Sequence, residues 1–297
     1  MNNSPVIPIA VATLGICTYA AMDALMKGLA IELGVYNAML WRTSIALLIA
    51  TVLFVGQGIH WPPVSSIRLH IRRGAITAVM ACLFFWGLIY VPLAEAIGLS
   101  FIAPLIALYL AAVLLGERIG RQAVWASLIG FAGALVILGG KLGGDYAANV
   151  VLGMAAILAS AVLYAYNLIL QRQQAVVAKP IEIAFFQNAT VVALYWIFAP
   201  FWAVVPTTAV LPELLGAALL GVFSMAMLSW AYARAEARVL IPVEYSAFIW
   251  AALLGWVMFA EAVTLATLLG TALIVVGCLV AARQQPERVE HVETTAL

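Results

Sequence analysis

Hydrophobic residues along this chain gather in long runs that short polar hinges separate. A helix needs ~20 mostly apolar residues to cross the hydrocarbon core of a membrane, and ten runs approach that length. They lack the polar alternation of barrel strands and are too long for such strands, so we predict helices. The predicted crossings are Pro5–Leu29, Val35–Val55, Arg73–Tyr90, Ala94–Leu115, Ala123–Leu138, Val150–Leu170, Ile183–Val204, Leu214–Ala233, Leu240–Phe259 and Leu265–Ala281.

Composition supports a membrane protein. Hydrophobic residues make up 66% of the 297 residues and charged residues 9%, with a mean hydropathy of +1.11. A soluble domain has roughly a quarter of its residues charged, so this surface must face lipid. We therefore predict an all-α integral membrane protein with ten transmembrane helices and no soluble domain. The polar tail, residues 284–297, is expected to be disordered.

Basic residues predict the orientation. With ten crossings and the N-terminus in the cytoplasm, eleven of the 14 Lys and Arg residues fall on the cytoplasmic side. Only Lys27, Arg42 and Lys141 fall on the other side. Positive charge accumulates inside, so both termini are predicted to be cytoplasmic, in the cell inner membrane. The net charge of +1 gives no reason to expect a nucleic-acid partner. A monomer in the lipid bilayer is expected.

The second half of the chain echoes the first. Tyr19 precedes Tyr164 by 145 positions, and Glu117 precedes Glu261 by 144. The basic residues change loops between the copies, as they must if a repeat of five crossings is inserted upside down. We therefore predict two inverted five-helix repeats, residues 1–145 and 146–283. Inverted repeats are typical of secondary transporters, which hold their substrate between the halves.

Two short motifs carry a resemblance. Leu115-Gly116-Glu117 precedes a helix that contains glycines, and Phe259-Ala260-Glu261 precedes Gly270 and Gly277 in the same way. Together with Lys27 and Arg42, they resemble the EamA domain of the drug/metabolite transporter superfamily. The resemblance covers almost the whole chain, and it implies a ten-helix carrier that moves metabolites, amino acids or drugs, commonly outward. Aromatic content and spacing most resemble the YddG-type amino-acid exporters. In two departures, Ala260 replaces the usual Gly, and Gln187 stands where an Arg would match Arg42.

The carboxylates have structural and functional interpretations. Glu117 and Glu261 lie at span ends, where each can accept hydrogen bonds from the free amides of the next helix start. Asp23 lies well inside the first span and is therefore a candidate charge contact for substrate. Alternatively, Asp23 and Lys27 neutralise each other, because they are four residues apart on one helical face. Glu244 could stabilise the first turn of its helix or contact a substrate amine.

Aromatic and amide side chains inside the spans suggest the ligand. In mid-span such groups need hydrogen-bond partners, and they usually face the bundle interior or a water-filled path. Aromatic faces with a few amides and hydroxyls suit a partly apolar zwitterion or cation. Packing between helices is the alternative for any one of them. The predicted substrate-binding residues are Trp86, Tyr90, Tyr164, Asn167, Gln187, Tyr245, Ser246 and Trp250.

Other function classes lack their motifs. The chain has no Gly-x-x-x-x-Gly-Lys-Ser/Thr segment for ATP, so a secondary carrier is predicted. An intramembrane enzyme would need a nucleophile, a base or metal ligands that converge on one place. His60 and His70 are predicted to lie in one loop, and no such set is found. A channel would need a selectivity sequence or a charged ring. We expect no cofactor and no metal, and an exporter of amino acids with broad specificity that includes aromatic ones. Planar cationic drugs or other small metabolites are the alternative substrates.

Overall fold

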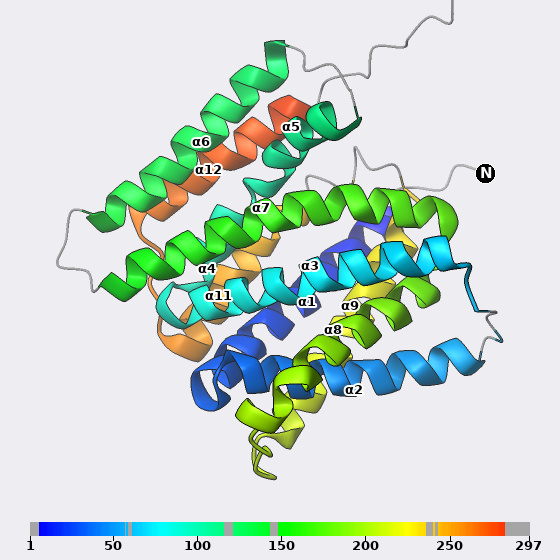
Figure 1. Ribbon diagram of the computed structural model, residues 1–297. Helices are drawn as coiled ribbons and strands as arrows, with labels where there is room; N and C mark the ends of the chain where they lie inside the picture. The colour runs from blue at the N-terminus through cyan, green and yellow to red at the C-terminus, as the bar shows by residue number, and fades with distance from the viewer. Residues whose placement is uncertain are drawn as a thin grey trace, which may run out of the picture.

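All regular structure in the described part of the chain is helical. The computed structural model describes residues 6–56, 58, 61–115, 121–142, 148–235, 240 and 243–282. Its helices form one bundle (Figure 1). They are α1 (Val6–Leu33), α2 (Val35–Gly56), α3 (Val64–Tyr90), α4 (Leu93–Ser100), α5 (Ala103–Leu115), α6 (Arg121–Leu142), α7 (Ala148–Val177), α8 (Pro180–Trp202), α9 (Leu211–Tyr232), α11 (Ala247–Phe259) and α12 (Leu265–Ala282).

Seven described segments are long and apolar enough to cross a membrane. They are Val6–Leu33, Val35–Gly56, Val64–Tyr90, Leu93–Leu110, Ala148–Gln171, Pro180–Trp202 and Leu211–Tyr232. Three shorter apolar helices, Val124–Gly140, Ala247–Phe259 and Leu265–Val280, occupy the remaining predicted crossings. The protein is therefore a multi-pass helical membrane protein. Glu117 and the tail 284–297 lie outside the described residues.

Several predicted crossings differ from the structure, since α7 continues to Val177 rather than ending at Leu170 and α11 begins at Ala247 rather than Leu240. The third helix begins at Val64 rather than Arg73, because charged residues interrupt a hydropathy run without ending the helix. His70 therefore lies in α3, and its prediction as a loop residue was wrong. The fourth crossing is divided into α4 and α5 at Phe101 and Ile102. This break precedes Pro104, whose ring and missing N–H disfavour a continuous helix at the preceding turn.

The helices pack in reciprocal pairs from the two halves of the chain. Helix α1 packs along α9, and α7 packs along α3. Helices α2 and α8 form one further pair, and α6 and α12 lie side by side at one end of the bundle (Figure 1). Glycines permit the closest approach. A Cβ atom at Gly87 would lie 2.6 Å from the carbonyl oxygen of Gly153, so α3 and α7 meet backbone to backbone.

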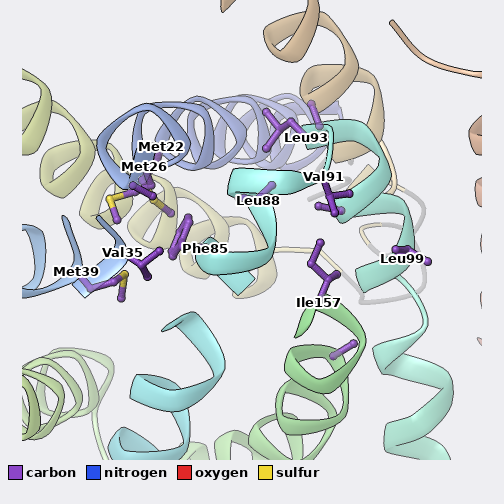
Figure 2. Packing of buried hydrophobic residues seen from close by; sticks show 14 of the residues in the cluster. Met22, Met26, Val35, Met39, Phe85, Leu88, Val91, Leu93, Leu99 and Ile157 are labelled. Carbon is purple, nitrogen blue, oxygen red and sulfur yellow. The ribbon is translucent and has the colours of Figure 1, made fainter. Parts of the chain in front are cut away.

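The core lies where α1 to α4 meet α7. Met22 and Met26 from α1 face Phe85 of α3, and Ile157 of α7 packs below Val91 (Figure 2). Several of these side chains are completely buried. The same region supports the polar groups described below, since α1 carries charged residues directly beside the two methionines.

Ala260 has an unusual backbone conformation. Its φ of 54° is the only positive φ of a non-glycine residue among the described residues. Left-handed geometry ends α11 there, and such a C′ position normally holds glycine. The sequence departure from Gly to Ala is therefore a strained position, with a cost of roughly 1 kcal/mol. The turn persists because the next residue, Glu261, is held by Lys27 of α1 and Leu93 of α4.

Candidate functional site

Glu261 is held by a network at the start of α4. Its carboxylate forms an ion pair with Lys27 of α1 and accepts a hydrogen bond from the Leu93 N–H at 2.8 Å. Lys27 also donates to the carbonyl oxygen of Val91 at 2.8 Å. The predicted structural role of Glu261 fits this geometry. The helix start it serves is α4, however, and not the next helix in sequence.

Asp23 is not neutralised by Lys27, so that alternative was wrong. The Lys27 side chain turns to Glu261, which lies 234 residues away in sequence. Asp23 is only 3% exposed, and it makes no hydrogen bond or ion pair with another described residue. Its electrostatic neighbour is Arg42 of α2. The helical spacing that suggested a local pair was correct, but a distant carboxylate binds Lys27 instead.

Polar side chains from both halves form a series of electrostatic neighbours that begins at Asp23. Tyr19 of α1 lies within electrostatic range of Asp23, Arg42 and Tyr164 of α7. Tyr164 in turn lies within range of Glu244, which accepts a hydrogen bond from the Tyr232 hydroxyl of α9. We call this set the central polar site. Its members are Tyr19, Asp23, Arg42, Tyr164, Tyr232 and Glu244.

The tyrosines of the central polar site are accessible. Tyr19 is 46% exposed and Tyr164 39% exposed, although charged groups from several helices surround both. A tyrosine that faced lipid would lack such neighbours. Partly exposed tyrosines that lie among charged groups are expected where side chains line a water-filled path between helices.

The sequence prediction identified part of this site. Asp23, Tyr164 and Glu244 were predicted, whereas Tyr19, Arg42 and Tyr232 were missed as contacts. The duplication contained the signal for Tyr19, because Tyr19 is the repeat counterpart of the predicted Tyr164. The two tyrosines lie within electrostatic range of each other.

A second polar network joins α3, α7 and α8. Arg73 donates to the side-chain oxygens of Asn167 at 3.0 Å and Gln174 at 2.6 Å. Since Gln174 presents its oxygen to Arg73, its amide nitrogen faces His70 Nδ1, at 2.8 Å. His70 Nε2 must then carry the hydrogen that it donates to Glu182, at 3.0 Å. His70 is completely buried and its ring stacks on Phe186.

This network places Asn167 between helices. Asn167 is 3% exposed, and its side-chain oxygen is occupied by Arg73. His70, Arg73, Gln174 and Glu182 were not predicted as a set. They come from three helices, and the loop assignment of His70 concealed the helical spacing of His70 and Arg73.

The other predicted substrate residues lie in three places. On α3, the Trp86 and Tyr90 rings meet edge to face with centroids 5.2 Å apart. Before α11, the Tyr245 ring meets that of Phe101 at 5.1 Å. Three of the predicted residues each have a buried polar atom without a hydrogen-bond partner among the described residues: Gln187 Oε1, Ser246 Oγ and Trp250 Nε1. Unsatisfied buried polar groups of this kind are uncommon and suggest sites where a ligand or water completes the bonding.

Two surface hollows lie away from these residues, and the first is formed by α2 and α8. It has a volume of about 350 Å³ and an apolar lining that includes Trp41, Trp196 and Pro200. A second hollow of about 330 Å³ lies against α12 and is lined by aliphatic side chains. Such apolar surfaces are expected where a membrane protein faces lipid.

Comparison with known proteins gives consistent results. The EamA-like transporter family matches residues 6–139 and 151–283. The pseudopaline exporter CntI of Pseudomonas aeruginosa is 28% identical over 277 residues, which cover 92% of this chain and 94% of that protein. A riboflavin transporter of Rhizobium johnstonii is 30% identical over 227 residues, or 74% of this chain and 71% of that protein. A protein of known crystal structure superposes with a TM-score of 0.62 at 25% identity and covers 95% of this chain and all of its own.

Proposed function

Because the chain belongs to the EamA-like transporter family, we propose that it is a secondary exporter of amino acids, aromatic ones included, that works by alternating access. The protein is a membrane transporter and not an enzyme, so the intramembrane enzyme considered from the sequence is set aside. The amino-acid specificity, the likeness to YddG-type exporters and the outward direction are parts of this proposal.

The observation that carries the proposal is the central polar site. It combines accessible tyrosine rings with an acidic and a basic side chain that do not form an ion pair with each other. An amino acid needs charged or dipolar contacts for its ends and an apolar wall for its side chain. Aromatic faces discriminate weakly between apolar shapes, so broad specificity follows.

The proposed architecture is ten crossings in two inverted repeats, residues 1–145 and 146–283. Reciprocal packing supports it, because α1 with α9 and α7 with α3 are the same pair exchanged between halves. The charge asymmetry supports cytoplasmic termini in the inner membrane. We propose that one monomer suffices, since both halves contribute to the central polar site.

We expect cysteines placed at Gly58 and Tyr146 to react from opposite sides of the membrane. An impermeant maleimide should label Gly58→Cys only from the cytoplasmic side and Tyr146→Cys only from outside, although Tyr146 lies beyond the described residues. Both cysteines are introduced into a variant in which Cys17, Cys82 and Cys278 are replaced. This cysteine-free variant alone should not react with the maleimide. Labelling of both positions from the same side would contradict the odd number of crossings between them.

Counterflow in proteoliposomes tests the function. Vesicles preloaded with unlabelled phenylalanine should accumulate labelled phenylalanine or threonine faster than empty vesicles, and the rate should saturate. A second candidate follows from the relatives, whose names specify pseudopaline and riboflavin. The panel therefore includes both compounds and planar cationic drugs. If one of these exchanged and no amino acid did, the amino-acid assignment would be wrong.

The same assay, applied to substituted proteins, tests where the substrate binds. Tyr164→Ala and Tyr245→Ala should each slow phenylalanine exchange while membrane insertion stays normal, because each removes an aromatic face near Glu244. Trp202→Ala, at an exposed helix end, is the matched control. If both tyrosine variants folded and exchanged phenylalanine at the rate of the parent, the substrate would not bind at these tyrosines.

A further inference from the structure

Asp23 and Arg42 are two opposite charges that share one site without joining. Asp23 is buried and has no hydrogen bond to another described residue. The Arg42 Nε atom is buried and has no acceptor in the described part of the chain. The nearest hydrogen-bonding atom to its Nη1 is the weakly accepting sulfur of Met22, at 3.9 Å. Burial of unpaired charge is costly, so this arrangement needs a reason.

Each charge is prevented from finding another partner. Lys27, four residues after Asp23, is bound to Glu261. Arg73, the nearest buried cation of α3, donates to Asn167 and Gln174. The remaining electrostatic neighbours of the pair are the hydroxyls of Tyr19 and Tyr195. The pair is thus left with uncharged neighbours, and each charge keeps its capacity for a ligand.

Space beside Arg42 comes from a glycine on α9. A Cβ atom at Gly221 would lie 3.5 Å from Arg42 Nη1 and 3.8 Å from Met22 Cγ. A methyl group would fit there, but a branched side chain would occupy the space beside the guanidinium. Arg42 therefore has room on the α9 side.

We propose that Asp23 and Arg42 together bind the two charged ends of a zwitterionic substrate, with Asp23 receiving the ammonium group and Arg42 the carboxylate. This inference rests on the proposed function and assigns its recognition element. An ammonium donates hydrogen bonds to a carboxylate, and a guanidinium offers a planar fork that matches a carboxylate. The half-exposed rings of Tyr19 and Tyr164 form the wall for the substrate side chain.

Binding of three related probes to the purified protein tests the assignment. Phenylalanine carries both charges, phenylethylamine only the ammonium and 3-phenylpropionate only the carboxylate. The parent should bind phenylalanine at least about 100-fold more tightly than either analogue, because a site built for a polar group rejects a ligand that lacks it. Calorimetric titration gives the Kd values in detergent, and phenylalanine counterflow is measured in parallel.

The variants should lose affinity in a crossed pattern. Arg42→Gln should weaken phenylalanine binding about 100-fold and leave phenylethylamine binding within a few fold of the parent. Asp23→Asn should weaken phenylalanine binding similarly and spare 3-phenylpropionate. Glu32→Gln on α1 and Arg72→Gln on α3 remove exposed charges and should bind all three probes as the parent does.

Further variants protect the test against poor folding. Arg42→Lys keeps the positive charge but loses the planar guanidinium that can donate two hydrogen bonds to one carboxylate. It should weaken phenylalanine binding about tenfold. Gly221→Val changes neither charge and should still weaken phenylalanine binding, whereas Gly221→Ala should not. The inference is overturned if the parent exchanges phenylalanine while the folded Arg42 and Asp23 variants keep parent affinities for all three probes. If the parent neither binds nor exchanges any amino acid, the proposed function itself fails.

Discussion

Replacement of Glu261 by alanine is expected to destabilise the protein by about 3–5 kcal/mol, the usual consequence of removing one partner from a buried ion pair. Lys27 and Glu261 are 4% and 16% exposed, so water cannot replace the lost carboxylate. The Leu93 N–H would also lose its acceptor at the start of α4. Thermal unfolding in detergent, followed by the loss of monodisperse protein on size exclusion, measures the effect.

A double variant separates charge from packing. Lys27→Met combined with Glu261→Met removes both charges, and a well-packed apolar pair often replaces a buried ion pair without loss. The double variant should therefore be more stable than Glu261→Ala alone. Glu32→Ala, which alters an exposed carboxylate on α1, should change stability by less than about 0.5 kcal/mol. If Glu261→Ala unfolded at the parent temperature, the network would not hold α4 in place.

The hydrophobic runs predicted most of the fold, because hydropathy reports directly on lipid burial. The errors of the hydropathy-based prediction have the same origin. The run near Arg73 gave the continuously apolar part of the third helix, while the backbone continues as a helix back to Val64. Hydropathy cannot detect a helix that extends past its apolar part. The break at Phe101 was also missed, although Pro104 stands just beyond it.

Local spacing could not predict the charge partners. Asp23 and Lys27 are neighbours on one helical face, and an isolated helix would pair them. In the folded protein, Glu261 competes for Lys27 from the turn after α11. That contact exists only once α1, α4 and α11 are packed, so no periodicity within α1 encodes it. The same holds for His70 and Glu182, which belong to separate helices and lie 112 residues apart in sequence.

The internal duplication was more informative about the site than composition was. Composition placed aromatic and amide residues inside spans, and it could not distinguish Trp86, which meets Tyr90 edge to face, from Tyr164, which lies within range of charged groups. The repeat relates Tyr19 to Tyr164, and the structure places these two tyrosines within electrostatic range of each other. Residues near the axis between two repeats approach their own counterparts, so a repeat match predicts proximity that single-position reasoning does not.

Substitution of Gly133 by leucine is expected to separate α6 from α12. A Cβ atom at Gly133 would lie 2.5 Å from the carbonyl oxygen of Gly270 and 2.8 Å from Ile274 Cγ1. The reciprocal contact is equally close, because a Cβ atom at Gly270 would lie 2.5 Å from the carbonyl oxygen of Gly133. Small residues let membrane helices associate through close packing, since lipid tails provide no hydrophobic drive to hold the helices together. The added side chain should cost about 3 kcal/mol or more.

Gly139 provides the matched control on the same helix. A Cβ atom there meets nothing within 4 Å, so Gly139→Leu adds the same apolar volume to α6 at an open position. Leucine also favours a helix over glycine by up to about 1 kcal/mol, and Gly139→Leu should therefore be neutral or slightly stabilising. Thermal unfolding and the yield of monodisperse protein should fall for Gly133→Leu and hold for Gly139→Leu. Equal behaviour of the two variants would mean that the α6–α12 contact does not depend on backbone approach at Gly133.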